Sequence, residues 1–195
     1  LNFEDIEPTF IESHRLSPFN IRGTDVDVVL DLMIHDIDIL LNLVKSDINN
    51  VLASGVSVLS NKIDMANTRI EFNNGCVANL TASRISQKQL RKLRIFENNK
   101  YTNIDFLHPS LETYILDNNK PKKHSPHIVV NENENKYILY SKSKIQPYNA
   151  LTLELDNFID SIIKQKRPVV SADDGLAAIE VAFNILKQIS LNINK

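Results

Sequence analysis

The sequence predicts an α+β fold: an open, mostly antiparallel sheet with helices packed on one face. Three observations lead to this prediction. Residues 26–44 form one long apolar segment, residues 50–141 alternate in polarity with a period of two, and residues 150–190 return to helical spacing. The 195 residues, 43% of them hydrophobic, are enough to bury the core of a single domain, which we place over residues 1–195.

Composition excludes two classes of partner. The formal net charge of −2 leaves no basic footprint, so we predict no binding of nucleic acid. Residues 26–44 are long enough to span a membrane, but the acidic and basic residues within them exclude a transmembrane helix, and we predict no membrane partner. Cys76 is the one cysteine, which permits no internal disulfide and is typical of a reducing compartment. We therefore expect a cytoplasmic protein.

The first two elements are a short strand and the long helix. Residues 9–16 alternate in polarity as a strand does, and residues 17–25 form a loop with Pro18 and Gly23. Thr24 or Asp25 is placed to cap the helix that follows. We expect this helix to end near residues 45–46.

The middle of the chain reads as a series of antiparallel strands. Asn73-Asn74-Gly75 supplies the positive-φ residues of a tight hairpin between two of them. Residues 117–126 are polar, with two prolines, and are predicted to form a mobile loop. The predicted strands cover residues 51–60, 64–72, 76–83, 90–96, 101–107, 111–116, 128–130 and 136–141.

Two helices close the chain. Residues 150–164 carry apolar side chains at helical spacing and end before Pro168. Ser171 is a suitable N-cap for a second helix over residues 171–190. With helices on one face, the other face of the sheet meets either solvent or a partner. Because that face carries little charge in the strand 76–83, we expect a homodimer or homotetramer that assembles through it.

The chemistry of the chain is concentrated in the first helix. Asp27, Asp31, His35 and Asp38 are spaced four, four and three residues apart, which places them on one stripe. Asp31 and His35 are close enough to hydrogen-bond on a helix, and a neighbouring carboxylate raises the pKa of a histidine and orients its ring. General acid–base catalysis requires these properties of a histidine. Asp38 adds a second carboxylate to the same pocket.

Two other interpretations of this stripe remain open. The polar side chains of a buried helix can simply satisfy one another, in which case the Asp31–His35 pair is structural. Alternatively, Asp31, His35 and Asp38 are ligands of a metal ion completed from elsewhere. One helix seldom supplies three ligands to one ion and the chain has no H-E-x-x-H, so we expect no metal. Further ligands of such an ion would come from His14, His108, His124 or His127.

Basic residues give a second set of candidates. Arg15 either clamps an anionic or polyhydroxylated substrate or forms a solvated strand end. A basic cluster further along the chain is either the exposed face of a loop and strand or a contact for phosphate, for example the diphosphate of a nucleotide sugar. This cluster consists of Arg84, Lys88, Arg91, Lys92 and Arg94.

Four stretches in this order resemble the C-terminal domain of the Gfo/Idh/MocA oxidoreductases, which act on sugars, nucleotide sugars and inositols with NAD or NADP. The stretches are D-x3-H-x2-D within LDLMIHDIDILLNL, the strand ASGVSVLS, the hairpin ANTRIEFNNGCVANLTASR and the tail LELDNFIDSIIKQKRPVVSADDGLAAIEVAFNIL. The resemblance implies a fold like the C-terminal domain of glyceraldehyde-3-phosphate dehydrogenase. It also implies that His35 is the catalytic acid–base, that Asp31 is its partner carboxylate and that Asp38 contacts the sugar hydroxyls.

The chain departs from the family in its cofactor site. It has no E-K-P motif, whose lysine is the family's other catalytic residue, and its four glycines cannot form G-x-G-x-x-G. We therefore expect that the Rossmann half is absent, that NAD or NADP is bound mainly by another domain, and that no cofactor-binding residue can be assigned here. Because the sequence begins without methionine, where the family's second domain begins, we expect a fragment that is inactive alone.

A different class of function remains possible from the same residues. The open sheet face would then make a dimer or bind a partner, and the Asp31–His35 pair would be structural. This alternative is a non-catalytic dimerisation or binding module.

Overall fold

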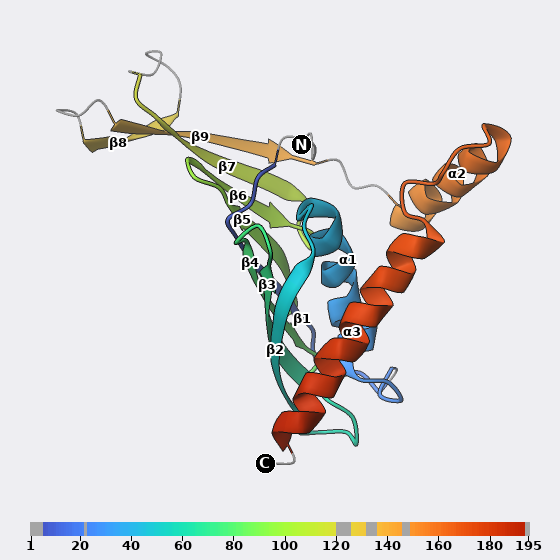
Figure 1. Cartoon of the computed structure of the whole chain (residues 1–195). Coiled ribbons are helices and arrows are strands. Elements are labelled where there is room, and N and C mark those ends of the chain that lie inside the picture. The colour runs from blue at the N-terminus through green and yellow to red at the C-terminus, as the bar shows by residue number, and fades with distance from the viewer. Residues whose placement is uncertain (1–5, 22, 120–125, 132–135, 146–148, 194–195) are drawn as a thin grey trace.

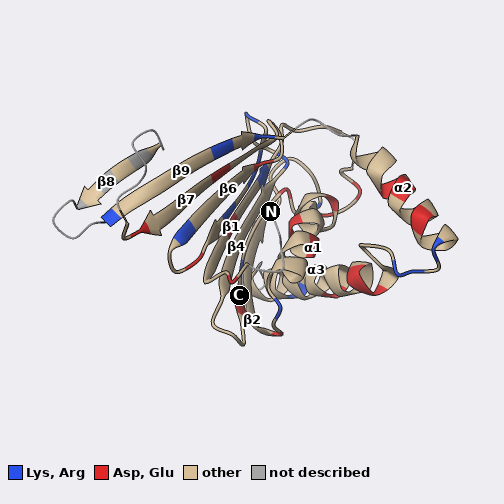
Figure 2. Cartoon of the chain, turned by 90° about the horizontal axis from the view of Figure 1, so that it is seen from above, with Lys and Arg blue, Asp and Glu red and all other residues tan. Residues whose placement is uncertain are grey.

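The computed structural model describes residues 6–21, 23–119, 126–131, 136–145 and 149–193. It has one large sheet with helices α1 and α3 packed against one face, while α2 lies apart from the sheet (Figures 1 and 2). The predicted α+β architecture, a mostly antiparallel open sheet with helices on one face, is confirmed. In the described part of the chain, no helix is both long and apolar enough to cross a lipid bilayer.

Within the described residues the sheet contains nine strands, in the order β2-β3-β4-β1-β5-β6-β7-β9-β8. The first strand is inserted at the centre, where it runs parallel to β4 and antiparallel to β5, and every other pair is antiparallel. The strand bounds are β1 Phe10–Leu16, β2 Ile48–Val56, β3 Met65–Phe72, β4 Val77–Ser83, β5 Leu90–Phe96, β6 Lys100–Asp105, β7 Ser110–Asp117, β8 His127–Asn131 and β9 Lys136–Lys144.

Each predicted strand has a counterpart at nearly the predicted bounds. The hairpin between β3 and β4 turns at Gly75, whose φ of +86° requires glycine in practice. One strand was predicted too long, because β2 ends at Val56 and residues 57–63 instead wrap around a buried carboxylate. The predicted loop 117–126 and the residues between β8 and β9 lie largely outside the described residues.

The long helix has two parts. A π-helical segment, η2 (Val29–Met33), leads directly into α1 (Ile34–Leu43). Its start differs from the prediction, since neither Thr24 nor Asp25 caps it and the carbonyl of Asp27 accepts the N–H groups of Leu30 and Asp31. A π-helical segment holds more residues per turn than an α-helix, so the side chains before it lie at different angles from those predicted by 3.6-residue spacing.

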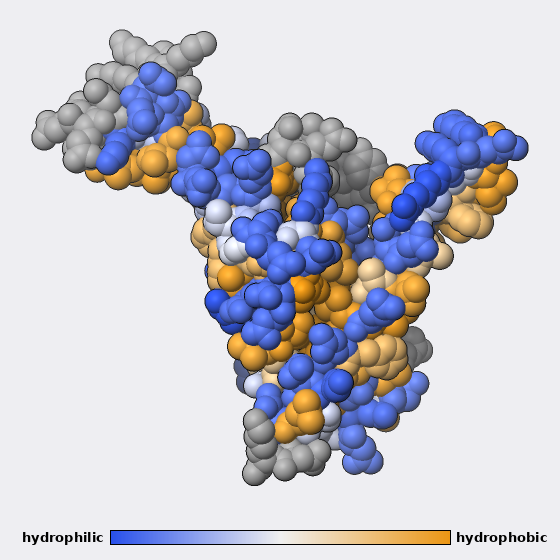
Figure 3. Space-filling view, in the orientation of Figure 1, coloured by the Kyte–Doolittle hydropathy of each residue, from blue (hydrophilic) through white to orange (hydrophobic). Residues whose placement is uncertain are grey.

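The closing helices are α2 (Ala150–Ile163) and α3 (Ala172–Ile193), close to the predicted bounds. Ser171 caps α3 reciprocally with Asp174: the Ser171 N–H and hydroxyl donate to the Asp174 carboxylate, at 2.8 and 2.7 Å, and the Asp174 N–H donates back to the hydroxyl. Helix α3 packs on β2 and α1 through Ala182, Ile185 and Ile189, which are buried. By contrast, the large apolar residues of α2 are exposed, as the space-filling view shows (Figure 3).

The core lies between the sheet and the helices η2, α1 and α3. Alternation places Ile11, Ser13 and Arg15 of β1 on this covered face, with the intervening residues on the open face. Other strands contribute Ala66, Ile70, Ala78, Leu80, Leu93 and Ile95, and the helices contribute Met33, Ile37, Leu40 and Leu43.

The open face carries a row of aromatic rings that runs across five neighbouring strands. Successive ring centroids are 5.8, 4.8, 5.4 and 4.9 Å apart, at separations typical of stacked or tilted aromatic pairs. The row, here called the aromatic row, consists of Phe10, Phe96, Tyr101, Tyr114 and Tyr140.

Candidate active site

An open cavity of about 840 Å³ lies between α1, α2 and residues 168–170. His35 and Asp38 supply its polar wall, at the start of α1. The volume falls within the range of small-molecule sites, which are commonly apolar clefts with a few polar groups. Its remaining lining residues are mostly apolar and come from α2 and the segment before α3: Leu153, Glu154, Leu155, Asn157, Phe158, Pro168, Val169 and Val170.

A buried ion pair lies directly behind His35. Arg15 of β1 donates from Nε and Nη2 to the two carboxylate oxygens of Asp36, at 2.7 and 2.9 Å, and both side chains are almost fully buried. Two parallel charge-assisted hydrogen bonds of this kind fix the relative position of the two groups. The pair therefore fastens the first turn of α1 to the centre of the sheet. As a substrate contact, Arg15 would have to act through Nη1 or the second N–H of Nη2, because Asp36 takes the N–H of Nε and one N–H of Nη2.

The predicted stripe of four polar residues is divided in the structure. Asp27 accepts the N–H of Ile63 at 2.7 Å, so it joins the start of the helix to the β2–β3 loop. Asp31 lies in the π-helical segment, with its carboxylate against Gly23. Only His35 and Asp38 line the cavity.

Asp31 and His35 do not form the hydrogen bond expected from their spacing of four, as far as the described residues show. The physical reason is the π-helical segment, which changes the angle between them. A Cβ atom at residue 23 would lie 3.3 Å from Oδ2 of Asp31, and the φ of Gly23 is +79°. Glycine is thus needed there for the backbone to approach the carboxylate of Asp31.

The expected rise in the pKa of His35 is also wrong in direction. Burial lowers its pKa below the ordinary value, and the positive charge of Arg15 lowers it further. Asp36 and Asp31 act in the opposite sense, but they do not outweigh burial and the guanidinium groups of Arg15 and Arg91. His35 is nevertheless exposed at the edge of the cavity. A neutral imidazole at neutral pH is the form that accepts a proton.

Asp38 has the opposite shift. Burial raises its pKa above the ordinary value, and the charge of Asp174 at the start of α3 adds to this rise, while His35 partly opposes it. Asp38 also lies beside Asn42, whose amide donates to its backbone carbonyl at 2.9 Å. The cavity wall therefore combines a histidine that favours its neutral form with a carboxyl that is less acidic than usual.

A second buried cluster holds the loop before the helix, and the sequence analysis did not identify it. Asp64 is fully buried and accepts the backbone N–H groups of Val58, Leu59 and Ser60, at 2.8, 2.7 and 3.0 Å, and the hydroxyl of Ser60 at 2.6 Å. These bonds hold its pKa well below the ordinary range despite its burial. Nε of Arg84 lies 3.8 Å from Oδ1 of Asp64.

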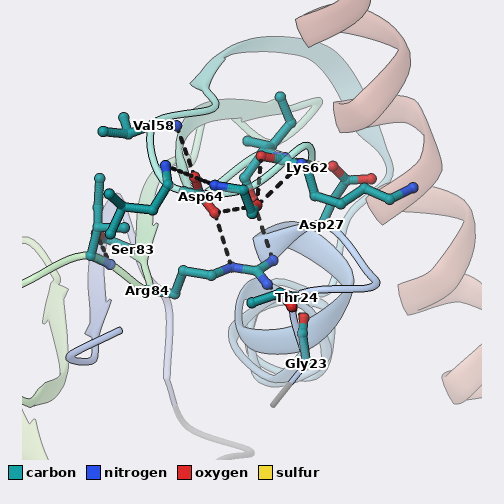
Figure 4. Close-up of polar contacts among 12 residues, drawn as sticks. Gly23, Thr24, Asp27, Val58, Lys62, Asp64, Ser83 and Arg84 are labelled. Atoms are coloured by element: carbon teal, nitrogen blue, oxygen red, sulfur yellow. Dashed lines mark hydrogen bonds and ion pairs between the residues drawn. The ribbon is translucent and has the colours of Figure 1, made fainter. Parts of the chain in front are cut away.

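Arg84 extends this cluster to the helix. Its Nη1 donates to the carbonyl of Gly23 and its Nη2 to the carbonyls of Val26 and Ile63, and Figure 4 shows the guanidinium between Asp64 and the loop. Arg84 was predicted to belong to an exposed basic face or a phosphate contact, and this prediction is wrong for Arg84, because its side chain is buried. The Asp64–Arg84 cluster positions Gly23, and with it the carboxylate of Asp31.

The other predicted ligands do not meet at this site. His14 is on the open face of the sheet, opposite to the helices, and His108 follows β6. His124 lies outside the described residues, as does the side chain of His127. Among the residues that the structure describes, no group of three or more His, Cys, Asp or Glu is arranged to hold a metal ion.

Comparison with known proteins gives a consistent result. Residues 21–191 match the C-terminal alpha/beta domain of an oxidoreductase family, Gfo/Idh/MocA. A curated relative, UDP-N-acetylglucosamine 3-dehydrogenase of Acidithiobacillus ferrooxidans, is 44% identical over 107 residues, or 55% of this chain and 34% of that protein.

Solved structures show the same architecture. A structure of the Acidithiobacillus ferrooxidans enzyme superposes with a TM-score of 0.84 at 29% identity, over 96% of this chain and 56% of that one. Scyllo-inositol dehydrogenase from Lactobacillus casei, solved with NAD(H) and scyllo-inositol, superposes with a TM-score of 0.65 at 18% identity, over 95% of this chain and 55% of that one. At that identity the likeness concerns the fold alone. The chain spans about half the length of these solved relatives.

Proposed function

Because the chain belongs to the Gfo/Idh/MocA oxidoreductases, matching their C-terminal domain over residues 21–191, we propose that it is the substrate domain of an NAD(P)-dependent dehydrogenase. The reaction is oxidation of a hydroxyl group on a sugar, nucleotide sugar or cyclitol. The observation that carries the proposal is the placement of His35 at the edge of the cavity, with the Arg15–Asp36 ion pair behind it.

We also infer that this chain does not supply the main cofactor site. Its four glycines provide no Gly-rich phosphate loop, and none of the described helices begins at such a loop. We propose that NAD or NADP is bound mainly by a domain outside these 195 residues and that this chain alone is inactive. The length of the solved relatives supports this division.

The chain's own residues have four roles in this proposal. His35, neutral at physiological pH, accepts the proton of the substrate hydroxyl at a ring nitrogen. Asp31 acts on His35 through its charge, since the two do not hydrogen-bond, and so favours the imidazolium that forms. Asp38, on the same cavity wall, binds the hydroxyls of the sugar. Apolar residues of α2 and residues 168–170 cover the rest of the bound molecule.

The test is a pair of histidine substitutions in the complete natural protein. We expect His35→Ala to lower kcat by about 10²- to 10⁴-fold with folding retained, because it removes the proton acceptor. His14→Ala is the matched control, since His14 lies on the opposite face of the sheet. UDP-N-acetylglucosamine is the first substrate to assay, on the basis of the curated relative. Unchanged turnover in His35→Ala would refute the proposal and favour the non-catalytic module.

We also propose that the protein forms a homodimer or homotetramer through the open sheet face. The aromatic row supports this, because its rings lie on the face that none of the described helices covers. Sedimentation should show an oligomer for the natural protein and monomers for Tyr114→Arg. Asn184→Arg on α3, an exposed position, is the control and should leave the oligomer intact. A monomeric natural protein would contradict the proposal.

A further inference from the structure

The five residues of the predicted basic cluster differ in their partners. Arg84 is buried with Asp64, as described above. Lys92 lies 3.6 Å from Asp105, and Arg94 donates to Glu12 at 2.9 Å. Within the described part of the chain, Lys88 and Arg91 have no acidic partner.

Strand register distinguishes Arg91 from its neighbours. Arg91 lies directly opposite Arg15 in the β1–β5 pair, so the two are on the same face, the one that the helices cover. Lys92 and Arg94 point to the open face, where Arg94 pairs with Glu12. Arg91 is at the beginning of β5, beyond the buried Leu93 and Ile95, and its side chain is exposed.

Arg91 is therefore a cation without an acidic partner among the described residues, opposite the arginine that binds Asp36, the residue next to His35. Two guanidinium groups directly opposite each other in a sheet repel, and Asp36 neutralises only Arg15. The charge of Arg91 reaches His35, since it contributes to the lowered pKa of that residue. A planar guanidinium presents several donors in a fixed fork, which matches the paired oxygens of a phosphate or a carboxylate.

We propose that Arg91 binds an anionic group of the substrate and so selects phosphate- or carboxylate-bearing sugars over neutral ones. This inference rests on the proposed function, because it places the substrate against His35. It makes Arg91 a specificity-determining residue and assigns it no part in proton transfer. The shared chemistry is a pair of anionic oxygens, supplied by the diphosphate of a nucleotide sugar or by the carboxylate of a uronate.

The experiment measures binding of three probes by calorimetric or NMR titration of the complete protein. Uridine 5′-diphosphate carries the phosphate, glucuronate carries the carboxylate, and uridine is the neutral control. We expect Arg91→Gln to weaken binding of one of the two anions about 10- to 100-fold, as the loss of a charged hydrogen bond does, and to leave uridine binding unchanged. Arg94→Gln is the matched control on the same strand and should change each affinity less than twofold.

The outcomes separate this inference from the proposed function. Weakened UDP binding identifies the phosphate as the anion, and weakened glucuronate binding identifies the carboxylate. Arg91→Gln is also tested in the His35→Ala background, where Arg91-dependent binding should persist whether or not His35 proves catalytic. Natural affinity in Arg91→Gln for both anions, an equal loss in Arg94→Gln, or no binding of either anion by the natural protein would overturn the inference.

Discussion

Replacing Asp64 by asparagine tests whether the buried Asp64–Arg84 cluster holds the loop before the helix. Asp64 accepts three backbone N–H groups and one hydroxyl, and it lies beside the Arg84 guanidinium. Asparagine keeps one acceptor oxygen but turns an NH₂ donor toward these donors and leaves Arg84 without its counter-charge. Breaking a buried ion pair from one side costs about 3–5 kcal/mol, so we expect the free energy of unfolding to fall by about that amount.

Thermal and urea unfolding measure this loss. For a chain of this length each kcal/mol corresponds to about 2–4 °C, so the expected fall in Tm is about 6–20 °C. Asp160→Asn is the matched control, because Asp160 pairs with Lys164 at the exposed surface of α2, and it should leave Tm nearly unchanged. Equal Tm shifts in the two variants would refute the reasoning.

The effect should also depend on pH in a defined sense. The pKa of Asp64 is lowered in the folded state, so the unfolded chain takes up the proton more readily as pH falls. The advantage of the natural protein over Asp64→Asn should therefore be complete above the ordinary carboxyl pKa, near pH 4, and diminish below it. An advantage that stays constant down to pH 2.5 would show that the charge of Asp64 is not responsible.

Three further predictions concern single residues. Gly23→Ala should destabilise the protein by about 1–2 kcal/mol and lower activity, since the φ of residue 23 is +79° and the new Cβ would press on Asp31. Gly175→Ala is the control: residue 175 lies on α3 with open space around it, so this variant should be more stable by about 0.5–1 kcal/mol in the same urea unfolding experiment. An NMR titration of His35 should give a midpoint below 6.5, and the stability contributed by its neutral form should be lost as pH falls from 6.5 toward that midpoint; a midpoint above 6.5 would contradict the effects of burial and guanidinium charge. Cys76, with its pKa raised to about 11 by burial, should react with a thiol reagent at pH 8 at least about 100-fold more slowly in the folded protein than in urea, and equal rates would show that the site is open.

Periodicity accounts for most of the fold because it reports which face of each element is buried. The hairpin of β3 and β4 was predicted in full, since alternation and Asn73-Asn74-Gly75 agree. The π-helical segment was not predicted. It is only five residues long, which is too short for the spacing of apolar residues along the sequence to reveal a change in residues per turn. Its effect falls on the candidate site, where it separates Asp31 from His35.

The buried ion pair behind His35 had a partial signal in the sequence. Alternation in β1 places Arg15 on the same face as Ile11 and Ser13, the face that proved to be covered. A buried arginine is costly without a carboxylate partner. Asp36 is the acidic residue of this helix that lies outside the predicted polar stripe, so it was a candidate for that partner. By contrast, Asp64 and Arg84 lie one residue beyond the Met65–Ser83 pair of the predicted hairpin, and the Arg84 N–H donates to the Asp64 carbonyl at 2.9 Å. Alternation placed the two residues opposite each other, but it did not show that both side chains are buried.

The aromatic row has a practical optical consequence. The chain contains no tryptophan and five tyrosines, three of which stand in the row, so tyrosine dominates its near-ultraviolet spectrum. Rings held at centroid separations of 4.8 to 5.4 Å interact electronically, and their circular dichroism depends on how rigidly they are packed. Association through the open face would change the solvent around those rings and leave the helix side untouched. The unlabelled protein thus carries its own spectroscopic probe of that face.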